Sequence, residues 1–211
     1  MIVHMRTLQE TLLGSETILY DLEYTAWEGS KETGWSRPGE YREIVEIGAI
    51  KITPSPTGLV VIDRYSCLVR PKRNPVLSDY LTNLTGIAQA DIDTQGVAFA
   101  EAFQGFLDFI GQAAPLLSFG FDDEILMENL VLTRIANSLP AARFMNYRAS
   151  LCAALNIDPA TCSADLPKAV NIPHLSDKHR AIGDTLAQLA VLNYALKKNT
   201  ISSTPRLSFP R

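Results

Sequence analysis

The sequence is poor in cysteine, has no long apolar run and carries no excess of basic residues. Its three cysteines, Cys67, Cys152 and Cys162, are an odd number at spacings that match neither a zinc site nor a disulfide framework, so we expect reduced thiols. No stretch approaches the roughly 18 apolar residues of a membrane span, and the first residues lack the basic and apolar order of a signal peptide. We therefore expect a cytoplasmic protein without a membrane partner.

Acidic residues outnumber basic ones, 23 Asp and Glu against 19 Lys and Arg, for a net charge of -4. This balance argues against a broad basic face for long nucleic acid, because such a face must neutralise many phosphates. It leaves room for a narrow site at which metal ions supply the positive charge. Only 12 Gly and 12 Pro accompany 46% hydrophobic residues, which excludes collagen-like and wholly disordered chains.

Strand and helix patterns alternate along the chain, which predicts an α/β fold. A hairpin is expected where two segments rich in β-branched residues flank a turn at residues 54–58. The expected strands are residues 18–24, 44–53, 59–69, 115–120 and 143–147, and the expected helices are residues 97–110, 123–137 and 178–197. We expect one domain over residues 17–198, with a leader at 1–16 and a loose tail at 199–211.

Two acidic residues interrupt the first expected strand. Asp21 and Glu23 are two residues apart, so the pleat of a strand points both side chains to the same face. One interpretation is a strand end whose acids reach solvent. The other is metal ligation, because hard divalent cations bind carboxylate oxygens and would cancel the repulsion between the two charges.

A second acidic pair, Asp122 and Asp123, follows the strand expected at residues 115–120. One interpretation is structural: acids at a helix N-terminus cap the first turn and complement the helix dipole. A functional role requires this strand to lie beside the first one. Both acidic groups would then meet at the carboxyl edge of the sheet, where ligands usually bind in α/β folds.

His179 and Asp184 stand at the start of the last expected helix. On a continuous helix their spacing leaves them roughly 140° apart, so they converge only if His179 lies in the preceding loop. Gly183 beside Asp184 is a poor helix former, which indicates that this turn serves more than helix stability. Taken alone, His179 would be interpreted as a solvent-exposed histidine before a helix.

The order of these groups, D-x-E on an early strand, an Asp after a middle strand and H-x(4)-D at a late helix, resembles the DEDDh exonuclease family of the ribonuclease H-like fold. SFGFDD at residues 118–123 is similar to the S-W-G-x-x-D motif of the histone-mRNA exonuclease-type subgroup. EIVEIGAI at 43–50 and YLTNLTGI at 80–87 are similar to its second strand and its nucleotide-contacting segment. The resemblance covers residues 17–196.

The subgroup motif aligns Asp123, rather than Asp122, with the catalytic aspartate. Leu126 and Met127 lie three and four residues beyond Asp123, where the family has apolar residues, and this register favours the same choice. Phe119 stands where the subgroup often has Trp, which keeps an aromatic ring at that place.

The resemblance implies a central mixed five-stranded sheet flanked by helices, and a 3′-5′ exonuclease that releases nucleoside 5′-monophosphates from the 3′ end of single-stranded RNA or DNA. It implies two Mg²⁺ or Mn²⁺ ions, as in two-metal phosphodiester hydrolysis, with His179 as the general base. The implied metal ligands are Asp21, which would bridge the ions, Glu23, Asp123 and Asp184. The residues implied to contact the nucleotide are Leu22, Leu84, Thr85, Ile87 and Phe119.

Two other functions stay open. A regulatory binding protein could keep this fold without catalysis, although four carboxylates without metal would be destabilising. A proofreading subunit of a DNA polymerase is the other, and the tail from residue 199 is short for a partner-binding extension. Trp27, Trp35 and Arg37 in the long loop after the first strand could line a substrate groove or anchor that loop. Neither the choice between RNA and DNA nor the oligomeric state follows from the sequence.

Overall fold

The computed structural model describes residues 7–173 and 179–201, which fold around one mixed five-stranded sheet. The strands are β1 Thr17–Tyr24, β2 Ile44–Ser55, β3 Gly58–Leu68, β4 Leu116–Ser118 and β5 Phe144–Asn146. Their order in the sheet is β3-β2-β1-β4-β5. β1 pairs antiparallel with β2 and parallel with β4, so the first strand lies at the centre of the sheet.

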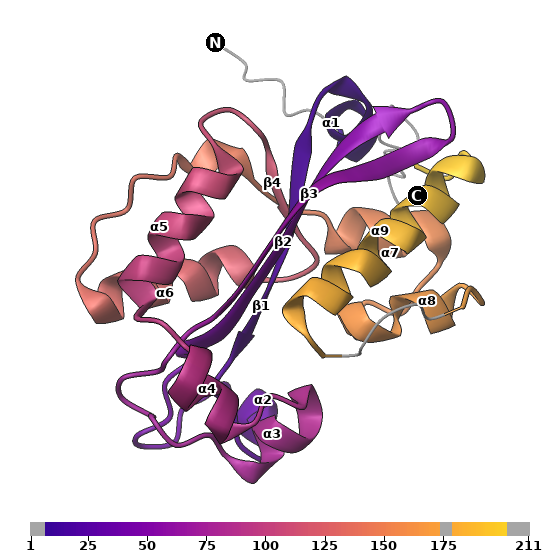
Figure 1. Ribbon diagram of the computed structural model, residues 1–211. Helices are drawn as coiled ribbons and strands as arrows, with labels where there is room; N and C mark the ends of the chain where they lie inside the picture. Colours follow the sequence, from indigo (N-terminus) through magenta and orange to yellow (C-terminus); the bar gives the residue numbers. More distant parts are fainter. Residues whose placement is uncertain (1–6, 174–178, 202–211) are drawn as a thin grey trace, which may run out of the picture.

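Helices cover both faces of this sheet (Figure 1). Their bounds are α1 Leu8–Gly14, α2 Ser30–Thr33, α3 Asp79–Thr85, α4 Gln89–Gln95, α5 Phe99–Ile110, α6 Asp122–Thr133, α7 Arg148–Leu155, α8 Leu166–Ala169 and α9 Ala181–Lys197. α5 and α6 pack on one face and α7, α8 and α9 on the other, while α2, α3 and α4 lie at the end of the sheet where β1 finishes. No helix of the described ranges is long and apolar enough to cross a lipid bilayer.

Alternation along β1 separates the two layers of the core. Leu19 faces the α9 layer, whereas Ile18, Tyr20 and Leu22 face the α5 and α6 layer. Asp21 falls on the same side as Leu19, because successive side chains of a strand point to opposite faces. The strand therefore delivers its acidic residues to the face that α9 covers.

The expected strands and long helices are present, and the differences lie at their ends. The helix expected to begin near residue 178 begins at Ala181, and the one expected to run to residue 137 ends at Thr133, where Arg134 takes a left-handed conformation with φ 58°. The expected leader is helical over α1, and its Leu8 and Leu12 are buried in the core. The expected tail is described only as far as Ile201.

The beginning of α9 is pressed unusually close to the sheet. A Cβ atom placed on Gly48 of β2 would lie 2.3 Å from the backbone carbon of Ala181, so only glycine fits at this position. Gly48 is the register partner of Asp21 on β1. The close approach therefore brings the first turn of α9 directly against the acidic part of β1.

Candidate active site

Three carboxylates converge where β1 meets the first turn of α9. One oxygen each of Asp21, Glu23 and Asp184 lie within 4.8 Å of one another. Asp21 and Asp184 are buried, with 7% and 2% of their surface exposed, and Glu23 is half-buried. A set of close carboxylate oxygens is the donor set that hard divalent cations prefer, so these residues fit a metal site.

The electrostatics of this cluster also favour a cation. Burial raises the pKa of the Asp21 carboxyl well above its ordinary range, and the charges of Asp122 and Asp184 raise it further. The pKa of Glu23 is raised by burial and then by the neighbouring charge of Asp184. Like charges held this close destabilise each other unless a proton or a cation compensates them.

Neighbouring side chains hold the clustered carboxylates in fixed orientations. The Gln188 amide donates a hydrogen bond from Nε2 to Asp21 Oδ1 at 3.1 Å, and the Tyr147 hydroxyl donates to Gln188 Oε1 at 2.8 Å. All three side chains are buried. The Ser163 hydroxyl donates to Asp184 Oδ2 at 2.7 Å. Nothing in the local sequence around Tyr147, Gln188 or Ser163 signals these long-range contacts, so these three residues were not predicted.

The Tyr147–Gln188–Asp21 chain predicts a graded series of variants. Gln188→Leu removes a hydrogen bond to a charged group and is expected to lower kcat by roughly 10- to 100-fold. Tyr147→Phe keeps the bond from Gln188 to Asp21 but removes the hydroxyl that orients the Gln188 amide. It should lower kcat only a few-fold, by about 1 kcal/mol or less. Steady-state kinetics on a labelled oligonucleotide check the order. Equal losses in the two variants would contradict this chain of support.

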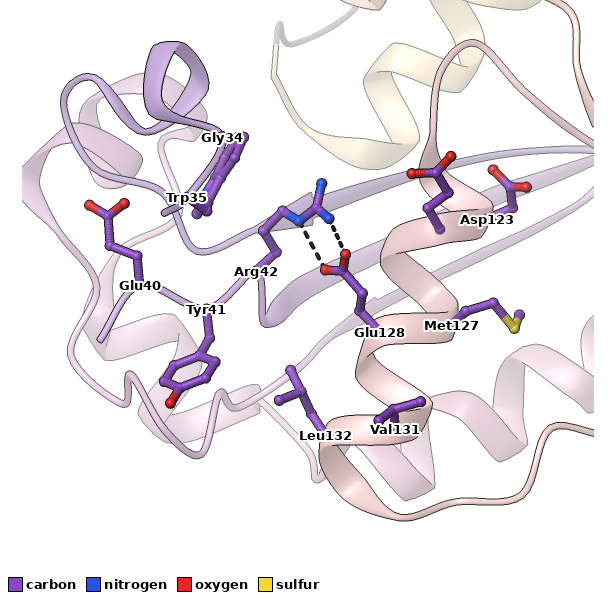
Figure 2. Close-up of a pocket in the computed structure, with 11 residues that line it drawn as sticks. Gly34, Trp35, Glu40, Tyr41, Arg42, Asp123, Met127, Glu128, Val131 and Leu132 are labelled. Atoms are coloured by element: carbon purple, nitrogen blue, oxygen red, sulfur yellow. Dashed lines mark hydrogen bonds and ion pairs between the residues drawn. The ribbon is translucent and has the colours of Figure 1, made fainter. Parts of the chain in front are cut away.

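The structure brings Asp122, not Asp123, to the acidic cluster, which is opposite to the expectation from the motif. Asp122 is buried, and its Oδ1 accepts a hydrogen bond from the backbone N–H of Leu22 at 3.2 Å, between the two acidic residues of β1. Burial raises the pKa of Asp122 to about 7. Asp123 is half-exposed and lines a separate pocket of about 690 Å³ between α6 and the loop after β1 (Figure 2).

Burial along α6 distinguishes the two possible registers of the apolar residues that follow the aspartate pair. Ile125 and Leu126, three and four residues beyond Asp122, are 2% and 0% exposed, whereas Met127 is only half-buried. The two residues that pack into the core at this spacing are therefore the ones counted from Asp122, not from Asp123. The sequence offers two apolar residues in either register, so only packing distinguishes them.

His179 lies outside α9, as its convergence with Asp184 requires. Its backbone has φ 54°, in the left-handed region, and its N–H donates to Asp184 Oδ1 at 3.2 Å. The side chain is half-buried. The chain turns sharply at His179 and places it beside a carboxylate of the cluster, before the helix begins.

A buried carboxylate on β2 anchors this turn. Glu46, fully buried, accepts hydrogen bonds from Arg180 Nη2 at 2.8 Å and Arg180 Nε at 3.0 Å, and from the backbone N–H of Ala181 at 2.9 Å. Glu46 of β2 thus caps the N-terminus of α9. The roles of Glu46 and Arg180 were not predicted, although a Glu within an apolar strand is a signal that the sequence carries.

Most of the residues expected to contact a nucleotide are buried. Leu22 and Phe119 are 4% and 3% exposed and belong to the two core layers. Thr85 and Ile87 are 3% and 1% exposed, and the Thr85 hydroxyl serves the end of α3 by donating to Leu81 O. These four side chains expose little surface to a substrate because they are packed against other residues of the protein. Leu84, half-buried, is the member of the expected set that presents surface.

The loop after β1 is anchored by its own aromatic and basic residues. Trp35 donates from Nε1 to Thr25 O at 2.9 Å, and the Arg42 guanidinium lies 5.7 Å from its ring centre. Arg37 donates to Glu28 O and pairs with Glu40. Figure 2 shows Trp35 and Arg42 side by side, with Arg42 paired to Glu128 of α6. These contacts support the loop-anchor interpretation of Trp35 and Arg37.

Known proteins share both sequence and fold with this chain. A PolC-type DNA polymerase III of Clostridium perfringens is 26% identical over 186 residues, which is 85% of this chain and 12% of that protein. The 3′-5′ exonuclease eri1 of Schizosaccharomyces pombe is 30% identical over 113 residues, which is 54% of this chain and 35% of that protein. The chain therefore spans only a minor part of either relative.

Solved structures confirm the fold. The nuclease domain of 3′hExo, a DEDDh family member bound to rAMP, superposes with a TM-score of 0.72 at 21% identity and covers 92% of this chain and 98% of that one. The expected ribonuclease H-like architecture, with a mixed five-stranded sheet between helical layers, is thus correct. The exonuclease family model RNase_T matches residues 18–192, nearly the whole described chain. This protein belongs to the RNase_T exonuclease family.

Proposed function

We propose that this protein is a 3′-5′ exonuclease that depends on divalent metal ions and releases nucleoside 5′-monophosphates from single-stranded RNA or DNA. The observation that carries the proposal is the convergence of Asp21, Glu23 and Asp184 within 4.8 Å, at the position where β1 meets α9. The similarity to eri1, a 3′-5′ exonuclease, supports the same activity and polarity. A cytoplasmic location stays a prediction from the sequence.

Four carboxylates are proposed to hold two Mg²⁺ or Mn²⁺ ions. They are Asp21, Glu23, Asp184 and, in place of Asp123, Asp122. When bound, such ions lower the pKa of water and stabilise the charge on the leaving oxygen of a phosphodiester. Gln188 and Ser163 fix the orientations of Asp21 and Asp184, so the site is organised before substrate arrives.

The remaining roles fall to His179 and Leu84. His179 is proposed to take the proton of the attacking water on a ring nitrogen, a role suited to imidazole. The water oxygen bonds to phosphorus, and the bond from phosphorus to the 3′ oxygen of the preceding nucleotide breaks, so the product keeps its phosphate on the 5′ carbon. Leu84 is proposed to contact the terminal nucleoside. An apolar contact there tolerates any base.

A strand-degradation assay tests the activity, its polarity and its metal dependence together. Single-stranded RNA and DNA of matched sequence, labelled at the 5′ end, should give a ladder of shortening strands with Mg²⁺ or Mn²⁺ and no products with EDTA. Labelling at the 3′ end should release labelled mononucleotide from the start. Products from a circular single strand, or hydrolysis that persists after thorough chelation, would contradict the proposal.

The same assay separates the other candidate functions. A regulatory binding protein on this fold would bind the strand without shortening it under any metal condition. A polymerase-associated proofreading exonuclease is the candidate that the similarity to PolC-type polymerase favours. That function requires faster removal of a mismatched 3′ terminal nucleotide than of a paired one on primed DNA, which the assay measures with a duplex of each kind.

A further inference from the structure

A second pocket lies on the β4 and β5 side of the acidic cluster. Its volume is about 590 Å³, and Phe121 at its edge has 61% of its surface exposed. Asn146 of β5 and Arg148 of α7 supply its polar groups, and Asn156 lies on the turn that follows. We call this the upstream pocket. The exposed ring of Phe121, directly before Asp122, offers an aromatic face close to the acidic cluster.

Arg148 gives the upstream pocket a fixed positive charge. Its guanidinium lies 4.7 Å above the centre of the Phe119 ring and donates from Nη1 to Pro159 O at 3.0 Å and from Nη2 to Phe119 O at 3.3 Å. The acceptors are neutral carbonyls, and within residues 7–173 and 179–201 no carboxylate forms a close ion pair with it, although its charge acts at longer range on Asp122 and opposes the rise in pKa that burial causes in that carboxyl. Its Nε also donates to Phe119 O. A guanidinium has five N–H groups, so two remain for an anion.

The upstream pocket adjoins the acidic cluster. Gly120 separates the two, and a Cβ atom placed on it would lie 3.3 Å from Asp122 Oδ2 and 3.9 Å from Arg148 Nη2. A phosphate beyond the cluster would therefore meet Arg148 within one nucleotide of the strand. The nearby acid Asp158 turns its Oδ1 to the backbone N–H of Ala160, at 2.8 Å.

Sheet order gives the two sides of the cluster different neighbours. β1 is the central strand, with β2 and β3 on one side and β4 and β5 on the other. α3, which carries Leu84, packs on the β2 side, where Leu81 and Ile87 share a cluster with Val45. Phe121 lies just after β4, and Asn146 is the last residue of β5. A strand with its terminal nucleoside at Leu84 and its scissile phosphate over β1 would extend toward the upstream pocket.

We propose that the upstream pocket binds the nucleotides on the 5′ side of the scissile bond, with Phe121 stacking on a base and Arg148 contacting a phosphate. This inference rests on the proposed exonuclease function, and it adds a binding site that does not discriminate between bases. Base stacking on an aromatic ring accepts every base. The pocket explains how an acidic protein holds a single strand, since the Arg148 guanidinium and the Phe121 ring lie where the strand leaves the acidic cluster.

Two substrates that differ only upstream test the proposal. Thymidine 5′-monophosphate p-nitrophenyl ester has no nucleotide beyond the scissile bond, whereas the oligonucleotide dT10 has nine. Phe121→Ala and Arg148→Gln should each lower the ratio of kcat/KM for dT10 to that for the ester by about tenfold, the usual size of a stacking contact. Val131→Ala and Arg64→Gln, matched exposed residues on α6 and β3, should leave the ratio unchanged.

Photo-cross-linking gives a readout that does not depend on turnover. In Asp21→Asn protein with Ca²⁺, 5-iododeoxyuridine at the second or third position from the 3′ end of dT10 should cross-link to the peptide that contains Phe121. The same base at the first or eighth position should not. Cross-links confined to other peptides, or an unchanged substrate ratio in Phe121→Ala, would overturn the pocket assignment while hydrolysis of both substrates still supported the exonuclease. Absence of hydrolysis with cross-linking intact would overturn only the proposed function.

Discussion

Asp122→Asn is expected to lower kcat by about 10³-fold or more, equivalent to about 4 kcal/mol of lost transition-state stabilisation. The substitution removes one negative charge beside Asp21. It keeps an oxygen that can accept the hydrogen bond from the Leu22 N–H, so the local backbone is preserved. Single-turnover rates with saturating Mn²⁺ measure the loss, and calorimetric titration of Mn²⁺ should show weaker binding in the absence of substrate.

Asp123→Asn is the matched control for this prediction. It makes the same change of charge one residue further along the first turn of α6, at a side chain that lines the pocket of Figure 2 instead of the cluster. Its kcat should stay close to the wild-type value. The reverse pattern would restore Asp123 as the ligand, and equal losses would mean that total charge at this helix end matters more than one carboxylate.

Thermal unfolding in EDTA separates lost chemistry from lost structure. Burial and neighbouring charge disfavour the ionised form of Asp122. Removing that charge from metal-free protein should therefore raise the unfolding midpoint while activity falls. A lower midpoint together with lower activity would indicate misfolding of the variant and would count against the ligand assignment.

His179→Asn is expected to lower kcat by roughly 10² to 10⁴-fold, the usual contribution of a general base. Asn is the informative replacement because it tolerates the left-handed backbone conformation, φ 54°, that His179 adopts. The hydrogen bond from its backbone N–H to Asp184 is retained, so the loss reports on the imidazole. Pre-steady-state rates at saturating Mn²⁺ provide the measurement.

Mn²⁺ affinity measured by direct titration decides between the roles open to His179. As a base, the histidine leaves the carboxylates to bind metal, so affinity should match the wild type. Near-normal turnover in His179→Asn would remove it from the mechanism. A large loss of Mn²⁺ affinity would instead make it a ligand or a support of Asp184.

Local patterns along the chain predicted the elements that carry most of the site. The two-residue spacing of Asp21 and Glu23 was enough to place both on one face, because strand periodicity is a property of neighbouring residues. The five-residue spacing of His179 and Asp184 likewise required a helix start between them, and α9 begins at Ala181. Helix ends were less predictable, since the end of α6 depends on the left-handed conformation of Arg134.

By itself, the sequence determined the fold class, the order of the acidic groups and their family, because each depends on patterns that neighbouring residues express. Only the tertiary structure decided which of Asp122 and Asp123 meets β1, since adjacent helical residues point about 100° apart and packing alone selects one. It also decided that Thr85, Ile87 and Phe119 are buried. The support of Asp21 joins residues 41 and 167 positions apart, and contacts over such distances exist only once the sheet and α9 have packed together.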